Sequence, residues 1–175
     1  MKTHNEYNNK LKFIIALAAV LVFAAPAAAF AANKYWVGDA GANTSVATNW
    51  KTTDPAACGG GDAGAAPGTS DIAIFDADCD NGATINGAWS VLGININAGY
   101  TGTVTQGNGN DITVGTSDFI QADGTFTGGD STSDVDYNDA FSISAGTFNA
   151  PVGIMTVAGG FTVSGTGAFN EGTGT

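Results

Sequence analysis

The sequence contains no arginine, and its one histidine is His4, near the N-terminus. Proteins neutralise nucleic-acid phosphates mainly with clustered lysine and arginine, so nucleic-acid binding is not expected. Without histidine in the rest of the chain, a Ser-His-Asp site, a Cys-His site or a histidine-ligated zinc site cannot form there. The sequence therefore predicts a protein that is not an enzyme and has no catalytic residues.

The one long apolar run covers residues 13–25 and is too short to span a bilayer comfortably. It follows a lysine-containing start and precedes the small-x-small pattern of residues 29–31. We therefore expect residues 1–31 to be a secretory signal peptide, with no membrane insertion of the mature chain. The protein is then predicted to be secreted or held at the cell surface.

Positive charge is scarce in the expected mature chain, residues 32–175. Its only cations are Lys34 and Lys51, against 15 of the chain's 16 acidic residues, so its net charge is −13. This acidity disfavours binding to anionic lipid as well as to nucleic acid.

Cysteine is also rare, with only Cys58 and Cys79 present. In an exported chain an even number of cysteines favours a disulfide, and two cysteines without histidine would leave a zinc ion short of ligands. We expect a Cys58–Cys79 disulfide, which would stabilise the fold by about 3 kcal/mol.

What the sequence does contain is a repeat. Residues 119–126, 141–148 and 161–169 each begin and end with phenylalanine, and the first phenylalanine recurs after 22 and then 20 residues. A fixed period of this size predicts stacked structural units, here an all-β parallel β-solenoid (β-helix) with coils of about 21 residues. Its interior is predicted to hold Phe119, Phe126, Phe141, Phe148, Phe161 and Phe169.

The period extends to other strands. Residues 112–114, 135–137 and 155–157 give each unit a third strand, residues 102–104 align with 124–126, and Ile96 aligns with Phe119. An antiparallel β-sandwich is the alternative fold, because it also has many short strands with glycine-rich turns. It does not explain the repeated phenylalanines.

Residues 32–90 are predicted to form an N-terminal cap with lead-in strands and a disulfide loop, because a solenoid must close its open ends. Trp36 and Trp50 are favoured as the plug, and sugar stacking on an exposed Trp36, Trp50, Trp89 or Tyr100 is the alternative. Residues 91–175 are predicted to be the solenoid repeats, in an array that is truncated or continues.

The segments Tyr35-Trp36-Val37-Gly38, Thr48-Asn49-Trp50 and Pro67–Phe75 together resemble the lead-in of secreted bacterial autotransporter-passenger and adhesin-like β-helical repeat proteins. The resemblance covers residues 35–175. It implies a parallel β-solenoid in a secreted or surface location, and it brings no catalytic residues with it.

Asp76, Asp78 and Asp80 have the alternate spacing of a calcium loop, although Asn81 and Gly87 stand where an EF-hand needs glycine and glutamate. These three residues are predicted as a weak calcium site, with a solvated acidic turn as the alternative. A carboxylate pair of a glycosidase, drawn from Asp76/Asp78 or Asp134/Asp136, is less favoured.

These observations favour a structural or adhesive β-solenoid that needs no cofactor other than calcium. Its expected partners are cell-surface glycans or further copies of itself, through ligand-binding residues that the sequence does not identify. The alternatives are a calcium-assisted glycan-binding module and, less favoured, a carbohydrate-active enzyme.

Overall fold

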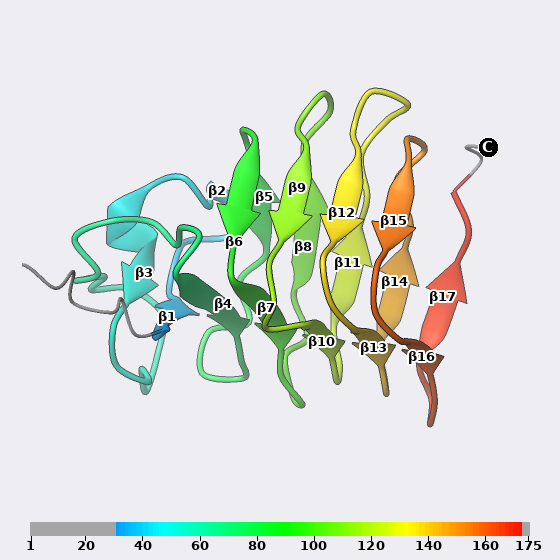
Figure 1. Ribbon diagram of the computed structural model, residues 1–175. Coiled ribbons are helices and arrows are strands. Elements are labelled where there is room, and N and C mark those ends of the chain that lie inside the picture. The colour runs from blue at the N-terminus through cyan, green and yellow to red at the C-terminus, as the bar shows by residue number, and fades with distance from the viewer. Residues whose placement is uncertain (1–30, 173–175) are drawn as a thin grey trace, which may run out of the picture. The chain divides into compact units, whose positions relative to one another are not determined.

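Short strands and tight turns alternate along residues 31–172, the part of the chain that the computed structural model describes. The strands wind into about four turns of a solenoid, each of about 22 residues (Figure 1). Sheet A contains β3 (Trp50–Lys51), β1 (Ala32–Trp36), β4 (Asp71–Phe75), β7 (Gly93–Ile96), β10 (Phe119–Gln121), β13 (Phe141–Ile143) and β16 (Phe161–Val163).

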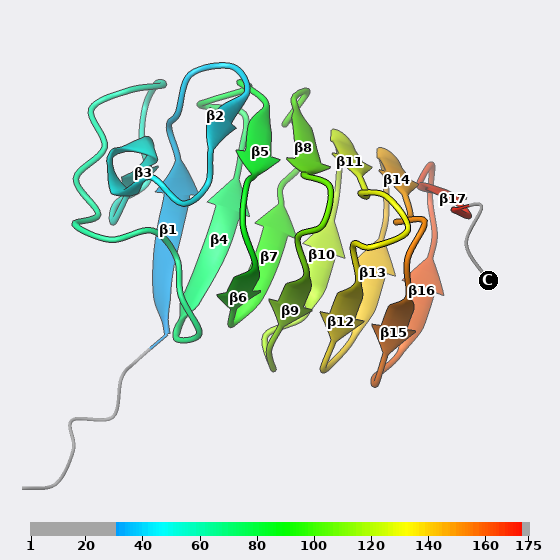
Figure 2. The ribbon, with the colours of Figure 1, turned by 90° about the horizontal axis from the view of Figure 1, so that it is seen from above.

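The other two sheets complete each coil. Sheet B contains β2 (Ala42–Asn43), β5 (Ala83–Ile85), β8 (Thr103–Gln106), β11 (Thr125–Thr127), β14 (Thr147–Asn149) and β17 (Ala168–Asn170). Sheet C contains β6 (Trp89–Val91), β9 (Ile112–Val114), β12 (Val135–Tyr137) and β15 (Met155–Val157). Figure 2 shows the strands of each sheet lying side by side along the solenoid.

Neighbouring coils pair in parallel, which confirms the predicted solenoid and excludes the sandwich. Phe119 lies opposite Phe141 and Phe141 opposite Phe161, while Phe126 lies opposite Phe148 and Phe148 opposite Phe169. The predicted third strands are also in register, β9 with β12 and β12 with β15. Among the described residues, the one antiparallel pair is β1 with β3 at the N-terminal end.

One predicted alignment is wrong. The structure pairs Phe119 with Ile94 rather than with Ile96, which lies opposite Gln121. Ile94 and Ile96 point to the same face because strand side chains alternate, so hydrophobicity alone cannot distinguish the two registers. The turn before β10 absorbs the two extra residues and includes Asp118, which has a positive φ of 58°.

The phenylalanines form two columns inside the solenoid. The rings of Phe119, Phe141 and Phe161 stack at 5.0 Å per step, and the column of Phe126, Phe148 and Phe169 lies edge-on beside them. The first four phenylalanines of the repeat are fully buried, as predicted. Phe161 and Phe169 also face inward as predicted, because their rings continue the two stacks. Phe161 is nevertheless 50% exposed and Phe169 only partly buried, since no described coil covers them.

The glycine of each repeated Gly-Thr-Phe unit is required by the backbone conformation and by the close packing of the coils. Gly124 and Gly146 adopt positive φ values of 64° and 78°, in a region that favours glycine. A Cβ atom on Gly146 would lie 2.4 Å from the carbonyl oxygen of Gly124 in the preceding coil. Side chains are therefore excluded where one turn stacks directly on another.

The N-terminal end of the solenoid is closed by aromatic side chains. Trp36 and Trp50 are completely buried, with ring centroids 5.2 Å apart, and both pack against Phe75 of β4. Each indole N–H donates to a backbone carbonyl, that of Trp36 to Asn81 and that of Trp50 to Thr44. The predicted plug role of these two tryptophans is confirmed.

The predicted signal peptide lies almost wholly outside the described residues, and the structure does not test it. In residues 31–172, no helix is long and apolar enough to cross a membrane.

Candidate functional site

The two cysteines lie near the N-terminal end of the solenoid. Cys58 and Cys79 form a disulfide with a Cα–Cα distance of 4.7 Å, as predicted. The bond ties the loop after β3 to the turn after β4. Asn81 joins the same turn to the residues after β1 by donating its side-chain amide to the carbonyl oxygen of Gly38.

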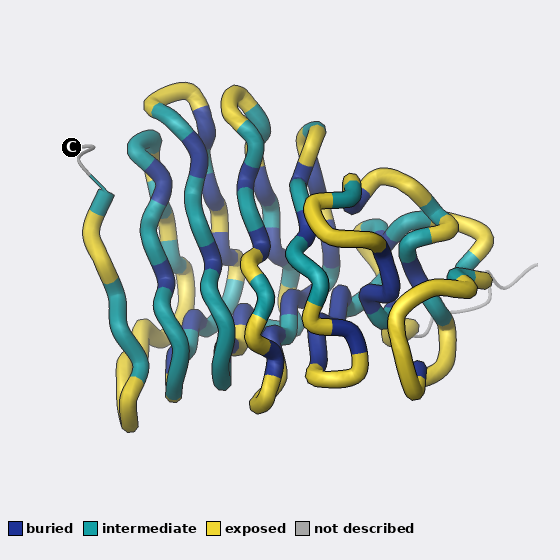
Figure 3. The backbone as a smooth tube through the Cα atoms, turned by 180° about the vertical axis from the view of Figure 1, so that it is seen from behind, coloured by how far each residue is buried: buried dark blue, intermediate teal, exposed yellow. Residues whose placement is uncertain are grey.

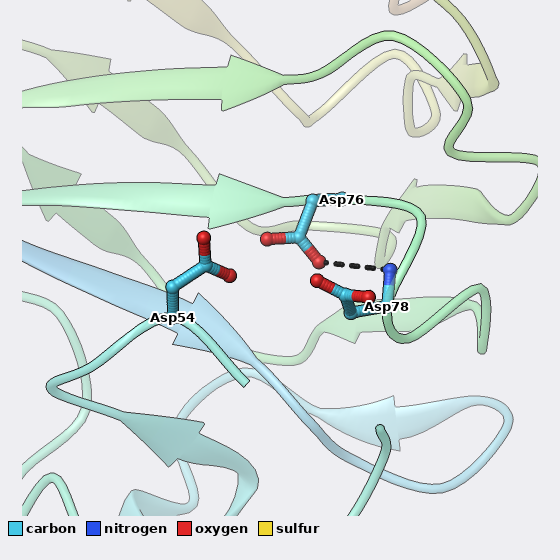
Figure 4. A group of neighbouring side chains, drawn as sticks. All are labelled: Asp54, Asp76 and Asp78. Carbon is cyan, nitrogen blue, oxygen red and sulfur yellow. Dashed lines mark hydrogen bonds between the residues drawn. The ribbon is translucent and has the colours of Figure 1, made fainter. Parts of the chain in front are cut away.

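The disulfide loop brings three carboxylates together. Oxygen atoms of Asp54, Asp76 and Asp78 lie within 4.8 Å of one another (Figure 4). Asp76 Oδ1 accepts the backbone N–H of Asp78 at 3.2 Å. Because calcium prefers several converging oxygens, this group offers three of the six to eight that calcium takes.

Asp80 is not part of this group, which corrects the predicted calcium ligands. Its carboxylate turns toward the next coil and accepts the backbone N–H of Thr101 at 2.7 Å. The strand ends at Phe75 and the disulfide holds Cys79, so alternate spacing no longer places the three aspartates on one side. Asp54, which is remote in sequence, takes the third place.

The electrostatics of the group are unfavourable without a cation. Burial raises the pKa of Asp76 above its usual value, and repulsion from Asp54 and Asp78 raises it further, while hydrogen bonds from the backbone of Asp78 and Cys79 lower it. A cation bound between the three carboxylates would remove this repulsion.

Most other aspartates at the turns connect neighbouring coils. Asp111 accepts the backbone N–H of Asp134, Asp134 accepts that of Ile154, and Asp118 accepts that of Ala140. Asp136 accepts a hydrogen bond from the Thr156 hydroxyl. The pair Asp134/Asp136, considered above as glycosidase carboxylates, is therefore engaged in holding coils together.

The aromatic residues considered for sugar stacking are not available. Trp36, Trp50 and Tyr100 are fully buried, and Trp89 is 7% exposed. The Tyr100 hydroxyl donates to the carbonyl of Asn81, and burial raises its pKa. Stacking of a glycan on these rings is excluded by their burial.

The outer surface of sheet B carries a regular polar array. In sheets A and C, most strands bury their first and third residues, whereas β11 and β14 bury only the middle one. Sheet B thus presents two outward rows without charged side chains, which we name the Thr/Asn face. Figure 2 shows the strands β2, β5, β8, β11, β14 and β17 that carry these rows. The Thr/Asn face consists of Asn43, Thr84, Thr103, Thr105, Thr125, Thr127, Thr147, Asn149 and Asn170.

Two asparagines of the Thr/Asn face are held by side-chain hydrogen bonds. Asn170 donates its side-chain amide to Asn149 Oδ1 at 2.8 Å, and Asn149 donates to the carbonyl of Phe126. Side chains within one row repeat at about 4.8 Å from coil to coil, and the two rows lie about 7 Å apart along each strand. Sequence reasoning missed this surface, although the Thr-x-Thr pattern at residues 103–105 and 125–127 was its signal.

The last described coil ends in an apolar surface, which we name the open face and which is formed by β15, β16 and β17. Exposure reaches 58% at Ile154, 50% at Phe161 and 40% at Val163. A hollow of about 670 Å³ lies there, lined in part by Ala150, Pro151, Met155, Val157, Phe161 and Phe169. Figure 3 shows the contrast with the buried middle coils.

In comparisons with known proteins, the chain matches no protein-family model, no curated protein and no solved structure.

Proposed function

We propose that this protein is a secreted or cell-surface β-solenoid with a structural and adhesive role and without catalytic activity, in the manner of autotransporter passengers and adhesin-like repeat proteins. The solenoid supplies a rigid support, because each coil is joined to the next by parallel ladders on three sides. Its outer surface is fixed by that support rather than by flexible loops.

The observation that carries this proposal is the Thr/Asn face. Hydroxyl and amide groups at fixed spacing can form hydrogen bonds with a repeating polar ligand, and the lack of charge on sheet B fits a neutral one. Because the ladders between coils already fix the backbone that carries these side chains, little backbone entropy would be lost on contact. A neutral cell-surface glycan is the partner that this chemistry fits.

The proposal is tested by measuring binding to an array of neutral glycans. The variant Thr105→Glu places a charge in the middle of the Thr/Asn face and is expected to reduce binding at least about tenfold. Ser142→Glu is the matched control on the outer side of sheet A and is expected to bind like the unaltered protein. Binding that is absent in the unaltered protein, or is the same in both variants, would contradict the proposal.

A second candidate function is calcium-assisted glycan binding, which the Asp54–Asp76–Asp78 group supports. Calcium would offset two of the three negative charges and hold the disulfide loop against β4. Thermal unfolding with calcium and with chelator tests this candidate, with Asp76→Asn as the variant that removes the central carboxylate. A melting temperature that calcium leaves unchanged would exclude it.

A further inference from the structure

The open face carries the same kinds of apolar side chains that are buried between coils elsewhere in the solenoid. At the position of Phe161, the preceding coil has Phe141, which is completely buried. Val163 is 40% exposed, whereas its register partner Ile143 is completely buried. The rings of Phe141 and Phe161 stack at 5.0 Å, so Phe161 is packed on one side as Phe141 is. Phe161 is more exposed because no described coil covers its other side.

Backbone groups at the open face are also without partners. Among the described residues, β15 pairs only with β12, β16 only with β13, and β17 only with β14. Exposed strand edges beside apolar side chains favour pairing with another chain, and native proteins usually protect such edges. The open face therefore continues the established contact between coils and has room for one more layer.

We propose that the open face binds the open face of a second copy of this chain, forming a tail-to-tail dimer with two-fold symmetry. This inference is independent of the adhesive function proposed above.

The opposite end of the molecule explains why like faces should meet. There β3 runs antiparallel to β1, and Trp50 is fully buried beneath the residues that follow it. A head-to-tail contact would have to add a strand to sheet A at β3, where the Trp50 carbonyl oxygen already accepts the backbone N–H groups of Asp62 and Ala63. An interface made twice from the same surface closes at two copies, whereas a head-to-tail interface would grow into a filament.

The geometry of this dimer follows from its symmetry. A two-fold axis that is perpendicular both to the solenoid axis and to β16 reverses the strand direction, so β16 would pair antiparallel with β16 of the second copy. Centred on Thr162, this pairing places Phe161 of one copy opposite Val163 of the other, apolar against apolar. The hollow beside Phe161 and Phe169 would be covered in the same step.

Charge sets the conditions of association. Of the residues that line the hollow, only Glu171 is charged, but the chain as a whole is strongly acidic. Repulsion between two acidic molecules is screened by salt, whereas apolar contact is not weakened by it. The dimer is therefore expected to become tighter as salt is added.

The experiment is sedimentation equilibrium of the purified protein, with and without residues 1–30, over a range of concentrations and salt. A monomer–dimer equilibrium is expected, with no larger species. Val163→Asp should raise the dissociation constant at least about tenfold, because it buries one carboxylate from each copy. Ile120→Asp is the matched control, since Ile120 is also 40% exposed but lies on the outer side of sheet A.

Each other result would overturn the proposal. A monomer at all concentrations, a dimer that Val163→Asp does not weaken, or oligomers that grow with concentration would do so. A monomer that instead binds a peptide with the sequence of residues 141–163 would assign the open face to a further parallel coil. Circular dichroism of both variants shows whether a loss of dimer reflects a loss of fold.

Discussion

The two ends of the described solenoid differ in whether the apolar interior is covered. At the N-terminal end, Trp36 and Trp50 fill the cross-section, and β3 pairs with the strand edge. At the other end, Phe161 continues the internal column but stands half exposed. The repeat therefore encodes stacking of coils, while closure of an end requires sequence that does not repeat.

The largest expected effect is the loss of an aromatic ring at the N-terminal end, and the same change at the open face should cost much less. Trp50→Ala should lower the free energy of unfolding by about 3–5 kcal/mol, because it leaves a cavity in a fully buried cluster. Phe161→Ala should cost about 1 kcal/mol in the monomer, because half of that ring is already in solvent. Urea unfolding at low protein concentration measures both.

Phe141→Ala is the control for this comparison, since Phe141 has the place of Phe161 one coil earlier. It should resemble Trp50→Ala, with a loss of about 3–5 kcal/mol. Equal losses for Phe141→Ala and Phe161→Ala would show that the open face is covered in solution or that the coils are placed wrongly.

The next effect concerns the disulfide, which only the N-terminal end possesses. Replacing Cys58 and Cys79 together by serine should cost about 3 kcal/mol, because the unfolded chain regains the freedom of the closed loop. Hydrogen exchange should show the loss of protection first in β1 and β3, and last in β10 and β13. Reduction of the unaltered protein should reproduce the result, and uniform loss of protection would contradict a separate stabilisation of the cap.

The smallest effect concerns the carboxylates of the cap. Because the pKa of Asp76 is raised on folding, the folded state binds its proton more tightly than the unfolded state does. Stability from this proton is present below the unfolded value of 3.8 and is lost as the pH rises through the folded pKa. Asp76→Asn should therefore unfold at higher urea than the unaltered protein at neutral pH in chelator, and the difference should disappear in acid.

Asp130, in the turn before β12, provides the opposite case. Hydrogen bonds from Thr132, and then from Ser133 and Gly109, lower its pKa, so its contribution to stability is lost as the pH falls. If both Asp76→Asn and Asp130→Asn raised stability at neutral pH, general relief of negative charge would explain the data better than the local group.

The repeated residues made much of the fold predictable. Phenylalanines one coil apart must face the same way, so the columns at 119, 141 and 161 followed from spacing alone. The pairing of Phe119 with Ile94 could not be predicted from spacing, because Ile94 and Ile96 both face inward and fit the pattern equally well. That choice depends on the conformation of the turn before β10.

The candidate sites depended on contacts that spacing does not contain. Asp54 reaches Asp76 only because the disulfide folds its loop over β4, and Asp80 leaves the group to bind the backbone of Thr101. Thr105 and Thr127 follow residues predicted to face inward, so their outward position could have been predicted, whereas the rows that they form across coils depend on the register of sheet B. Periodic sequence thus predicted the interior better than the surfaces.

The most direct test of the stacked-coil structure is a pair of spin-label distances on the outer side of sheet B. Asn43 and Asn170 are separated by five ladder steps and Thr84 and Asn170 by four, so double electron–electron resonance should give backbone separations of about 24 Å and about 19 Å. Dilution with unlabelled protein removes distances between copies. A difference of one strand spacing between the two pairs is the predicted result, and equal distances, or a shorter distance for Asn43, would contradict a single parallel column of coils.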